Sequence, residues 1–191
     1  MPATLTSRRT IAFSLAALPA GLCLSARVLG ASNAMGNSKA VDGDGLAHTS
    51  ETIHQEITFK ADRRSVYEAL TNSKQFDAIT RLSDAVTLVT APSAKPTSIS
   101  RAVGGSFTLF GGYITGRNLE LLRDERLVQA WRAGSWDAGD YSIARFVLVA
   151  HGAETRLEFD HRGFPEGAGE HLANGWHTHY WEPLAKFLSR G

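Results

Sequence analysis

The sequence has one cysteine, Cys23, and almost no net charge. A single cysteine excludes an intramolecular disulfide framework and a cysteine-based zinc site. With 20 Lys and Arg against 19 Asp and Glu, the chain lacks the positive excess with which proteins bind phosphate backbones, so no nucleic-acid partner is expected. No Gly-x-Ser-x-Gly nucleophile motif occurs either. What is present, 191 residues of which 43% are hydrophobic, suffices for one globular domain with its own core.

The first 34 residues have the pattern of an export signal. The adjacent Arg8 and Arg9 precede a run of uncharged, Ala- and Leu-rich sequence, and Ser32 and Ala34 stand where a signal peptidase reads small side chains. Residues 7–13 resemble the twin-arginine signature. We therefore predict a signal peptide (1–34) of the twin-arginine type and export to the periplasm or the extracellular space.

Two alternatives for this segment are a membrane anchor and a lipoprotein signal. An uncleaved anchor needs about 20 mostly apolar residues, whereas this run is shorter and contains Pro19 and Gly21. A lipoprotein signal needs a small residue before its cysteine, and Leu22 precedes Cys23. Cleavage after Ala34 is therefore favoured, with no stable membrane insertion afterwards. Cleavage would remove the only cysteine and leave a slightly acidic chain.

Residues 35–50 are polar and rich in glycine, which indicates a flexible linker. Beyond it, residues 51–191 are predicted to form the domain, because apolar and polar residues alternate as in half-buried strands. Extended segments are expected at residues 53–59, 85–90, 105–110, 114–123, 127–133, 141–149 and 155–162. Asp62 is expected to cap a short helix, and a second short helix is expected at residues 74–79. One apolar face per strand is typical of an antiparallel sheet that is covered on one side.

The cover of that sheet is predicted to be one long helix over residues 169–189. At about 100° per residue, its apolar side chains share a face about half the circumference wide, which includes Trp176 and His177 and leaves His179 outside. Pro183 is expected to bend this helix, because it lacks a backbone donor and clashes with the preceding turn. The predicted fold class is α+β: a curved antiparallel sheet and two short helices that enclose a long C-terminal helix.

Several motifs resemble those of one protein family. They include Gly104-Gly105-Ser106-Phe107, Gln129-Ala130-Trp131, Asp160-His161 and Gly163-Phe164-Pro165-Glu166-Gly167. The most specific is His171-Leu172-x-x-Gly175-Trp176, followed by Tyr180-Trp181-Glu182-Pro183. From about Glu51 to Leu188 the chain resembles the START-like (SRPBCC) superfamily with its helix-grip fold. Within it, the chain is similar to the C-terminal domain of the activator of the heat-shock-protein-90 ATPase. The resemblance implies a hydrophobic cavity between sheet and helix, whose ligands vary across the superfamily.

Aromatic residues and the implied cavity favour a module that binds a small hydrophobic or aromatic molecule. The predicted ligand-binding residues are Trp131, Phe146, Phe159, His161, Trp176, His177 and Tyr180. The first alternative is a cavity enzyme of the cyclase, dehydratase or isomerase type, in which His161 and His177 transfer protons. The second alternative is a protein-interaction module related to chaperone ATPase activators, which would have a protein partner and a filled core.

His161 and His177 also have a purely structural interpretation. Both would then be buried and neutral, with hydrogen bonds to each other, to Tyr180 or to backbone, since buried polar groups need partners. A metal site built from these two histidines and Glu120 is a weaker alternative, because three ligands have to converge within a few ångströms. We therefore predict no metal and no cofactor.

The export signal makes a direct prediction. In the native host, the intact mass of the mature protein should correspond to a chain that begins near Met35. Replacement of both Arg8 and Arg9 by lysine should leave the precursor in the cytoplasm, because the twin-arginine pathway reads the pair. A full-length, membrane-bound protein would contradict cleavage, and normal export of the double mutant would indicate a different pathway.

Overall fold

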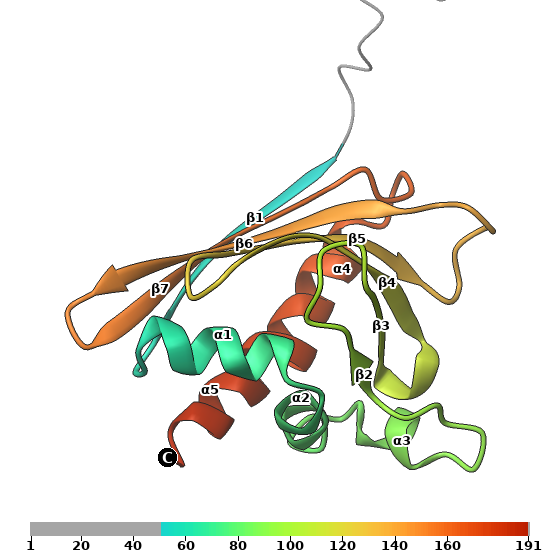
Figure 1. The fold of residues 1–191 in the computed structure, drawn as a ribbon. Helices are drawn as coiled ribbons and strands as arrows, with labels where there is room; N and C mark the ends of the chain where they lie inside the picture. The colour runs from blue at the N-terminus through green and yellow to red at the C-terminus, as the bar shows by residue number, and fades with distance from the viewer. Residues whose placement is uncertain (1–50, 191) are drawn as a thin grey trace, which may run out of the picture. The chain divides into compact units, whose positions relative to one another are not determined.

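The computed structural model describes residues 51–190, so the predicted signal peptide and linker lie outside the described residues. Its centre is a seven-stranded antiparallel sheet in the order β1-β7-β6-β5-β4-β3-β2 (Figure 1). The strands are β1 (Thr52–Phe59), β2 (Ser98–Ile99), β3 (Ser106–Leu109), β4 (Ile114–Leu122), β5 (Arg126–Ala133), β6 (Ser142–His151) and β7 (Glu154–Arg162). The first strand pairs with the last along the chain, so backbone hydrogen bonds join the start of the domain to the strand that precedes the C-terminal helices.

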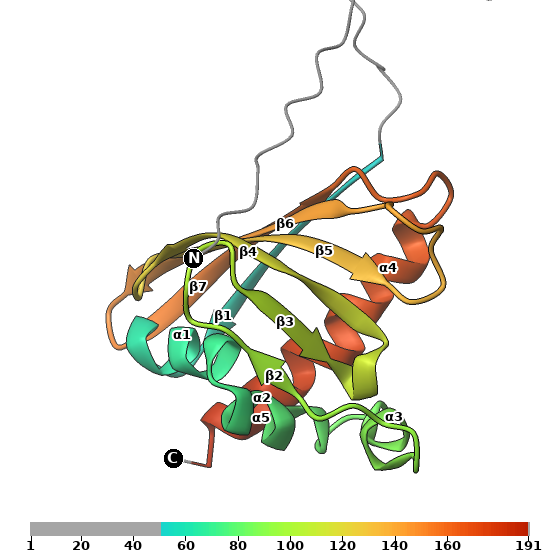
Figure 2. The ribbon, with the colours of Figure 1, turned by 45° about the vertical axis from the view of Figure 1, so that its right-hand side comes forward.

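The C-terminal helical segment (residues 169–188) lies along the concave face of this sheet, with α1 and α2 beside it (Figures 1 and 2). The helices are α1 (Arg63–Thr71), α2 (Ser73–Thr80), α3 (Val86–Thr90), α4 (Gly169–Trp176) and α5 (Glu182–Leu188). A 3₁₀ turn, η1 (Phe110–Gly112), precedes β4, and a π turn, η2 (His177–Trp181), joins α4 to α5. This confirms the predicted α+β helix-grip fold. Within residues 51–190, every helix is too short or too polar to cross a membrane.

The strands bury the faces that the alternation predicts. In β7, the side chains of Leu157, Phe159 and His161 are buried, and the residues between them are not. In β6, Phe146 lies directly opposite Phe159 of β7, with the two ring centroids 5.0 Å apart. The buried face of the sheet therefore supplies an aromatic surface on which the C-terminal helical segment packs.

The two short helices also begin where the sequence indicates. The carboxylate of Asp62 accepts a hydrogen bond of 2.7 Å from the backbone N–H of Ser65, which caps α1. The side chain of Asn72 caps α2 in the same way, through the N–H groups of Lys74 and Gln75. Both predicted helices are confirmed.

The prediction of a strand at residues 85–90 is wrong. Val86–Thr90 forms the short helix α3, although its β-branched residues favour extended structure. Local hydrogen bonds satisfy its backbone, since the Thr90 hydroxyl donates to the carbonyl of Val86 and the Ser83 hydroxyl accepts from the N–H of Ala85. Helix α3 also packs against η1. A Cβ on Gly111 of η1 would collide with the carbonyl oxygen of Leu88, so the close contact requires glycine at this position. In place of the wrongly predicted strand, the sheet contains the short strand β2, which pairs with β3.

The π turn η2 corrects the predicted phase of the long helix. It adds one residue to a helical turn, so later side chains are set back by about 100° relative to an unbroken α-helix. The N–H of Glu182 accordingly donates to the carbonyl of His177, five residues earlier. Pro183 has no backbone N–H, so a change of hydrogen-bond pattern beside it loses no bond that this residue could have donated. The irregularity expected at Pro183 thus takes the form of a π turn just before it.

Because of the π turn, the apolar side chains cover a narrower face of the helix, and His177 lies outside that face. Trp181 and Leu184 come back into line with Trp176, and all three are buried. The side chain of His177 is instead 61% exposed, and its Nδ1 lies 3.3 Å from the carboxylate of Glu182. The prediction that His177 is buried in the cavity region is therefore wrong.

The corrected phase can be tested by alanine substitutions along the helix. Leu184→Ala should reduce the free energy of unfolding by about 2–5 kcal/mol, because the Leu184 side chain is only 1% exposed. His177→Ala and the control Lys186→Ala should change it by less than about 0.5 kcal/mol, because both side chains face solvent. Urea unfolding provides the measurement. A loss at His177 as large as that at Leu184 would contradict the π turn.

Candidate functional site

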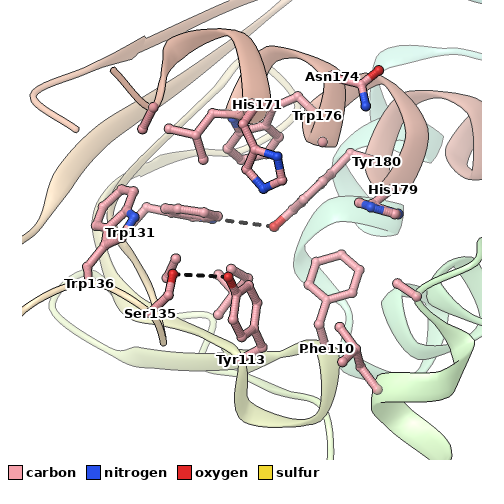
Figure 3. A pocket seen from close by; sticks show the side chains of 17 residues that line it. Phe110, Tyr113, Trp131, Ser135, Trp136, His171, Asn174, Trp176, His179 and Tyr180 are labelled. Atoms are coloured by element: carbon pink, nitrogen blue, oxygen red, sulfur yellow. Dashed lines mark hydrogen bonds between the residues drawn. The ribbon is translucent and has the colours of Figure 1, made fainter. Parts of the chain in front are cut away.

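One cavity of about 210 Å³ opens between the C-terminal helical segment and the end of the sheet formed by β4 and β5 (Figure 3). Its walls are mainly aromatic and aliphatic, and include Phe110, Ile114, Trp131, Trp136, Leu172, Trp176 and Tyr180. Its polar side chains are Tyr113, Ser135, His171, Asn174 and His179 together with the Tyr180 hydroxyl. No Asp, Glu, Lys or Arg is among the lining residues. Such an apolar cavity with a few polar groups has the composition of a small-molecule site.

Three of the predicted site residues meet at this cavity: Trp131, Trp176 and Tyr180. The indole of Trp176 lies 4.1 Å from the Tyr180 ring and 5.5 Å from the Trp131 ring, measured between centroids. The Trp131 Nε1–H donates a hydrogen bond of 3.3 Å to the Tyr180 hydroxyl (Figure 3). Strand β5 and the C-terminal helical segment are thereby connected at the cavity wall.

The Tyr180 hydroxyl keeps its proton. Burial raises the pKa of Tyr180 well above its ordinary value, because the phenolate would lose its hydration. A phenol both accepts and donates, and the bond from Trp131 uses only its acceptor. None of the hydrogen bonds among residues 51–190 has this hydroxyl as donor.

A chain of hydrogen bonds lies behind the cavity wall. The Trp176 Nε1–H donates to His161 Nδ1 at 3.0 Å, and His161 Nε2 lies 2.6 Å from the Ser142 hydroxyl. An indole can only donate, so Nδ1 carries no proton and the proton of the neutral ring is on Nε2. The Ser142 hydroxyl then accepts from His161 and donates to the carbonyl of Trp131 at 3.0 Å. Each member of this chain has a partner, so it fixes the Trp176 indole and the backbone of Trp131 together.

His161 is neutral at physiological pH. The side chain is fully buried, and burial lowers its pKa to about 4. The structural interpretation of His161 thus agrees with its surroundings, although its partners are Trp176 and Ser142 and not His177.

The other predicted site residues lie away from the cavity. Phe146, Phe159 and His161 form a layer behind Trp176, which separates them from the lining. His177 is on the solvent side of the helix. The structure therefore does not place the two histidines of the enzyme alternative at the cavity.

The metal alternative is not assembled. Glu120 forms an ion pair of 2.6 Å with Arg126, whereas His161 contacts Trp176 and Ser142, and His177 lies beside Glu182. Among the residues that the structure describes, no three His, Cys, Asp or Glu side chains form a group that could hold a metal ion.

Sequence reasoning missed several residues of the cavity, above all His179. The predicted apolar face excluded His179 because it included Trp181 and Leu184 as if no π turn preceded them. In the structure, the imidazole of His179 lines the cavity beside Gly175 and Trp176, four and three residues earlier on the helix (Figure 3). Its Nδ1 is buried and has no hydrogen-bond partner within residues 51–190. Tyr113 and Ser135, which bond to each other at 3.1 Å, were also missed. They come from short connections, and no periodic pattern identifies their position.

Fold and site together define the class: a helix-grip protein of the START-like superfamily with an apolar cavity beside its C-terminal helix. Residues 60–189 match the family described as "Activator of Hsp90 ATPase homolog 1-like protein", and the chain belongs to this family. The human "Activator of 90 kDa heat shock protein ATPase homolog 1" is 27% identical over 104 residues, which cover 54% of this chain and 31% of the relative. A relative from Dictyostelium discoideum is 26% identical over 129 residues, 67% of this chain and 30% of its own. The chain thus spans about a third of these curated relatives.

Solved structures share the fold. A crystal structure of an HSP90 activator from Plasmodium falciparum superposes with a TM-score of 0.62 at 21% identity, over 72% of this chain and 96% of that one. CalU16 from Micromonospora echinospora gives a TM-score of 0.57 at 20% identity, over 73% of this chain and 77% of that one. At these identities the similarity supports the fold and leaves the ligand open.

His161 predicts a pH dependence of stability. Its pKa is about 4 in the folded protein against 6.5 ordinarily, so between these values the unfolded chain binds a proton that the folded chain does not. Stability should therefore fall as the pH is lowered, by about 2 kcal/mol between pH 7 and pH 5 from this group. Urea unfolding at both pH values provides the measurement, and His161→Gln should abolish that part of the dependence.

The contribution of a second histidine has to be separated from this effect. His54 acts with the opposite sign: a hydrogen bond to Asp160 raises its pKa, so its contribution is present at low pH and is lost as the pH rises through that pKa. The measurement is therefore repeated in a His54→Gln background. An unchanged pH dependence in His161→Gln would contradict the neutral, buried state of His161.

Proposed function

We propose that this is an exported protein that binds a small apolar or aromatic molecule in the cavity beside Trp131, Trp176 and Tyr180. The observation that carries the proposal is the cavity itself, in a position that the C-terminal helical segment and the sheet enclose together. Export rests on the sequence of the first 34 residues, with its Arg8-Arg9 pair.

The volume of the cavity supports a ligand of one or two rings. An engineered apolar cavity of about 150 Å³ accepts benzene, whereas drug-sized ligands occupy about 300–1,000 Å³. At about 210 Å³ the cavity falls between these limits. Burial of roughly 200 Å² of apolar ligand surface contributes about 5 kcal/mol before association costs, so a ligand without polar contacts should bind no more tightly than a Kd on the order of 0.1–1 mM.

The polar side chains of the cavity support the same proposal. His179 lines the cavity with a half-buried imidazole. His171 and Asn174 lie at the same wall and offer further polar contacts (Figure 3). They give the cavity a means of orienting a ligand that is otherwise held by apolar contacts.

Binding can be tested with indane, a bicyclic hydrocarbon of suitable size, and with a variant that fills the cavity. Gly175 lines the cavity on α4, and a Cβ built there meets only the His179 ring, at 4.0 Å. Gly175→Leu should therefore fold and should weaken indane binding at least tenfold, because the added side chain occupies the site. Trp176 and Trp131 fluorescence and calorimetry provide the measurements.

The matched control is Ala185→Leu, which adds an equally large apolar side chain on the exposed side of α5. It should bind indane like the wild type. Equal binding by the wild type and Gly175→Leu, or no binding of indane at all, would overturn the proposal. Native mass spectrometry of protein from the original host would then identify the natural ligand that a confirmed site holds.

Family membership favours a second candidate, a protein-interaction module related to chaperone ATPase activators. The names of the human and Dictyostelium relatives describe activation of a 90 kDa heat shock protein ATPase. An ATPase assay of that chaperone with and without the purified chain tests this candidate. Stimulation that Gly175→Leu leaves unchanged would favour protein interaction over ligand binding.

A further inference from the structure

We propose that the cavity selects a neutral ring compound that carries a carbonyl oxygen, such as a cyclic aromatic ketone, and that Tyr180 donates the hydrogen bond that recognises it. This inference rests on the proposed ligand-binding function and names the chemical class of the ligand. It follows from three properties of the cavity: the state of one hydroxyl, the fixed orientation of its ring, and the composition of the lining.

The first property is that Tyr180 offers a donor. Its hydroxyl oxygen already accepts the Trp131 Nε1–H, and burial keeps the phenol protonated. The remaining O–H bond has no acceptor among residues 51–190, and the hydroxyl lies at the centre of the cavity (Figure 3). A ligand group at that point therefore has to accept a hydrogen bond.

The second property is that this donor is held in place. The Tyr180 ring packs against Phe110 and Phe76 in T-shaped arrangements, with centroid separations of 5.1 and 5.6 Å. Trp176 lies against its other side, 4.1 Å away between centroids. The ring thus cannot turn the hydroxyl out of the cavity, and little conformational entropy is lost when it bonds to a ligand.

The third property is that the lining contains imidazoles and phenols but no side chain of Lys, Arg, Asp or Glu among residues 51–190. A carboxylate or an ammonium group would lose hydration there without a permanently charged partner, which is more costly than burial of a carbonyl with one hydrogen bond. The flanking rings of Trp131 and Trp176 meanwhile suit a flat ring.

The test compares two probes of the same skeleton, 1-indanone and indane, which differ by the carbonyl oxygen. The wild type should bind 1-indanone about three- to tenfold more tightly than indane, as expected for one hydrogen bond. Tyr180→Phe should weaken 1-indanone binding about tenfold and leave indane binding unchanged, because the carbonyl then loses water without gaining a donor. Indane-1-carboxylate should bind the wild type at least tenfold more weakly than 1-indanone.

A spectroscopic measurement covers the case in which Tyr180→Phe does not fold. In the complex of the wild type with 1-indanone, the infrared C=O stretch should lie at lower frequency than in hexane, by about the shift that an alcohol solvent causes. Equal affinities for 1-indanone and indane, or an unshifted stretch, would overturn the ligand class and leave the proposed binding function intact. If none of the probes binds, the proposed function fails as well.

Discussion

The hydrogen bond from the Trp176 indole to His161 is the interaction on which the cavity wall depends. Trp176 contacts Phe159, Tyr180 and Trp181 with its ring faces and edges, and an indole in that position could rotate unless its N–H had a fixed acceptor. His161 provides that acceptor because burial keeps it neutral. Through Ser142 the same chain holds the backbone of Trp131, so the positions of Trp131 and Trp176 both depend on one buried imidazole. His161 is therefore a positioning residue, and its contribution to a ligand site is indirect.

Most of the fold could be predicted from the sequence, because it depends on patterns with a simple period. The two-residue alternation of β7 and the cap at Asp62 are local signals, and the structure agrees with both. The prediction failed where local preference and tertiary packing conflict. Val86–Thr90 consists mostly of β-branched residues, yet it forms a short helix that packs against Gly111 of η1. A single sequence does not report such a contact.

The site was predicted less well than the fold, for one physical reason. A helical projection assumes a constant rotation per residue, and the π turn η2 breaks that assumption between Trp176 and Leu184. Trp131, Trp176 and Tyr180 were found because large rings on facing elements tolerate a phase error. His177 and His179 differ by about 200° on an α-helix, so the same error exchanged the exposed and the cavity-facing histidine. Pro183 was the available signal, because a π turn is inexpensive where a backbone donor is already missing.

The energetic cost of the cavity connects the fold to the proposed ligand. Protein interiors are packed at nearly crystalline density, and a dry void costs about 24 cal/mol per Å³, so a cavity of about 210 Å³ would cost on the order of 5 kcal/mol if it were empty and closed. That cost is comparable to the whole stability of a small domain, and it is an upper limit, since water can enter from the open side. The rings could reduce it only by collapsing into the space, and the hydrogen bonds of Trp131 and Trp176 to Tyr180 and His161 oppose that collapse. Hydrogen bonds that keep the aromatic walls apart therefore benefit a protein whose cavity is occupied by a ligand. A chain selected for stability alone would be expected to close the space with larger side chains at positions such as Gly175 and Ala133.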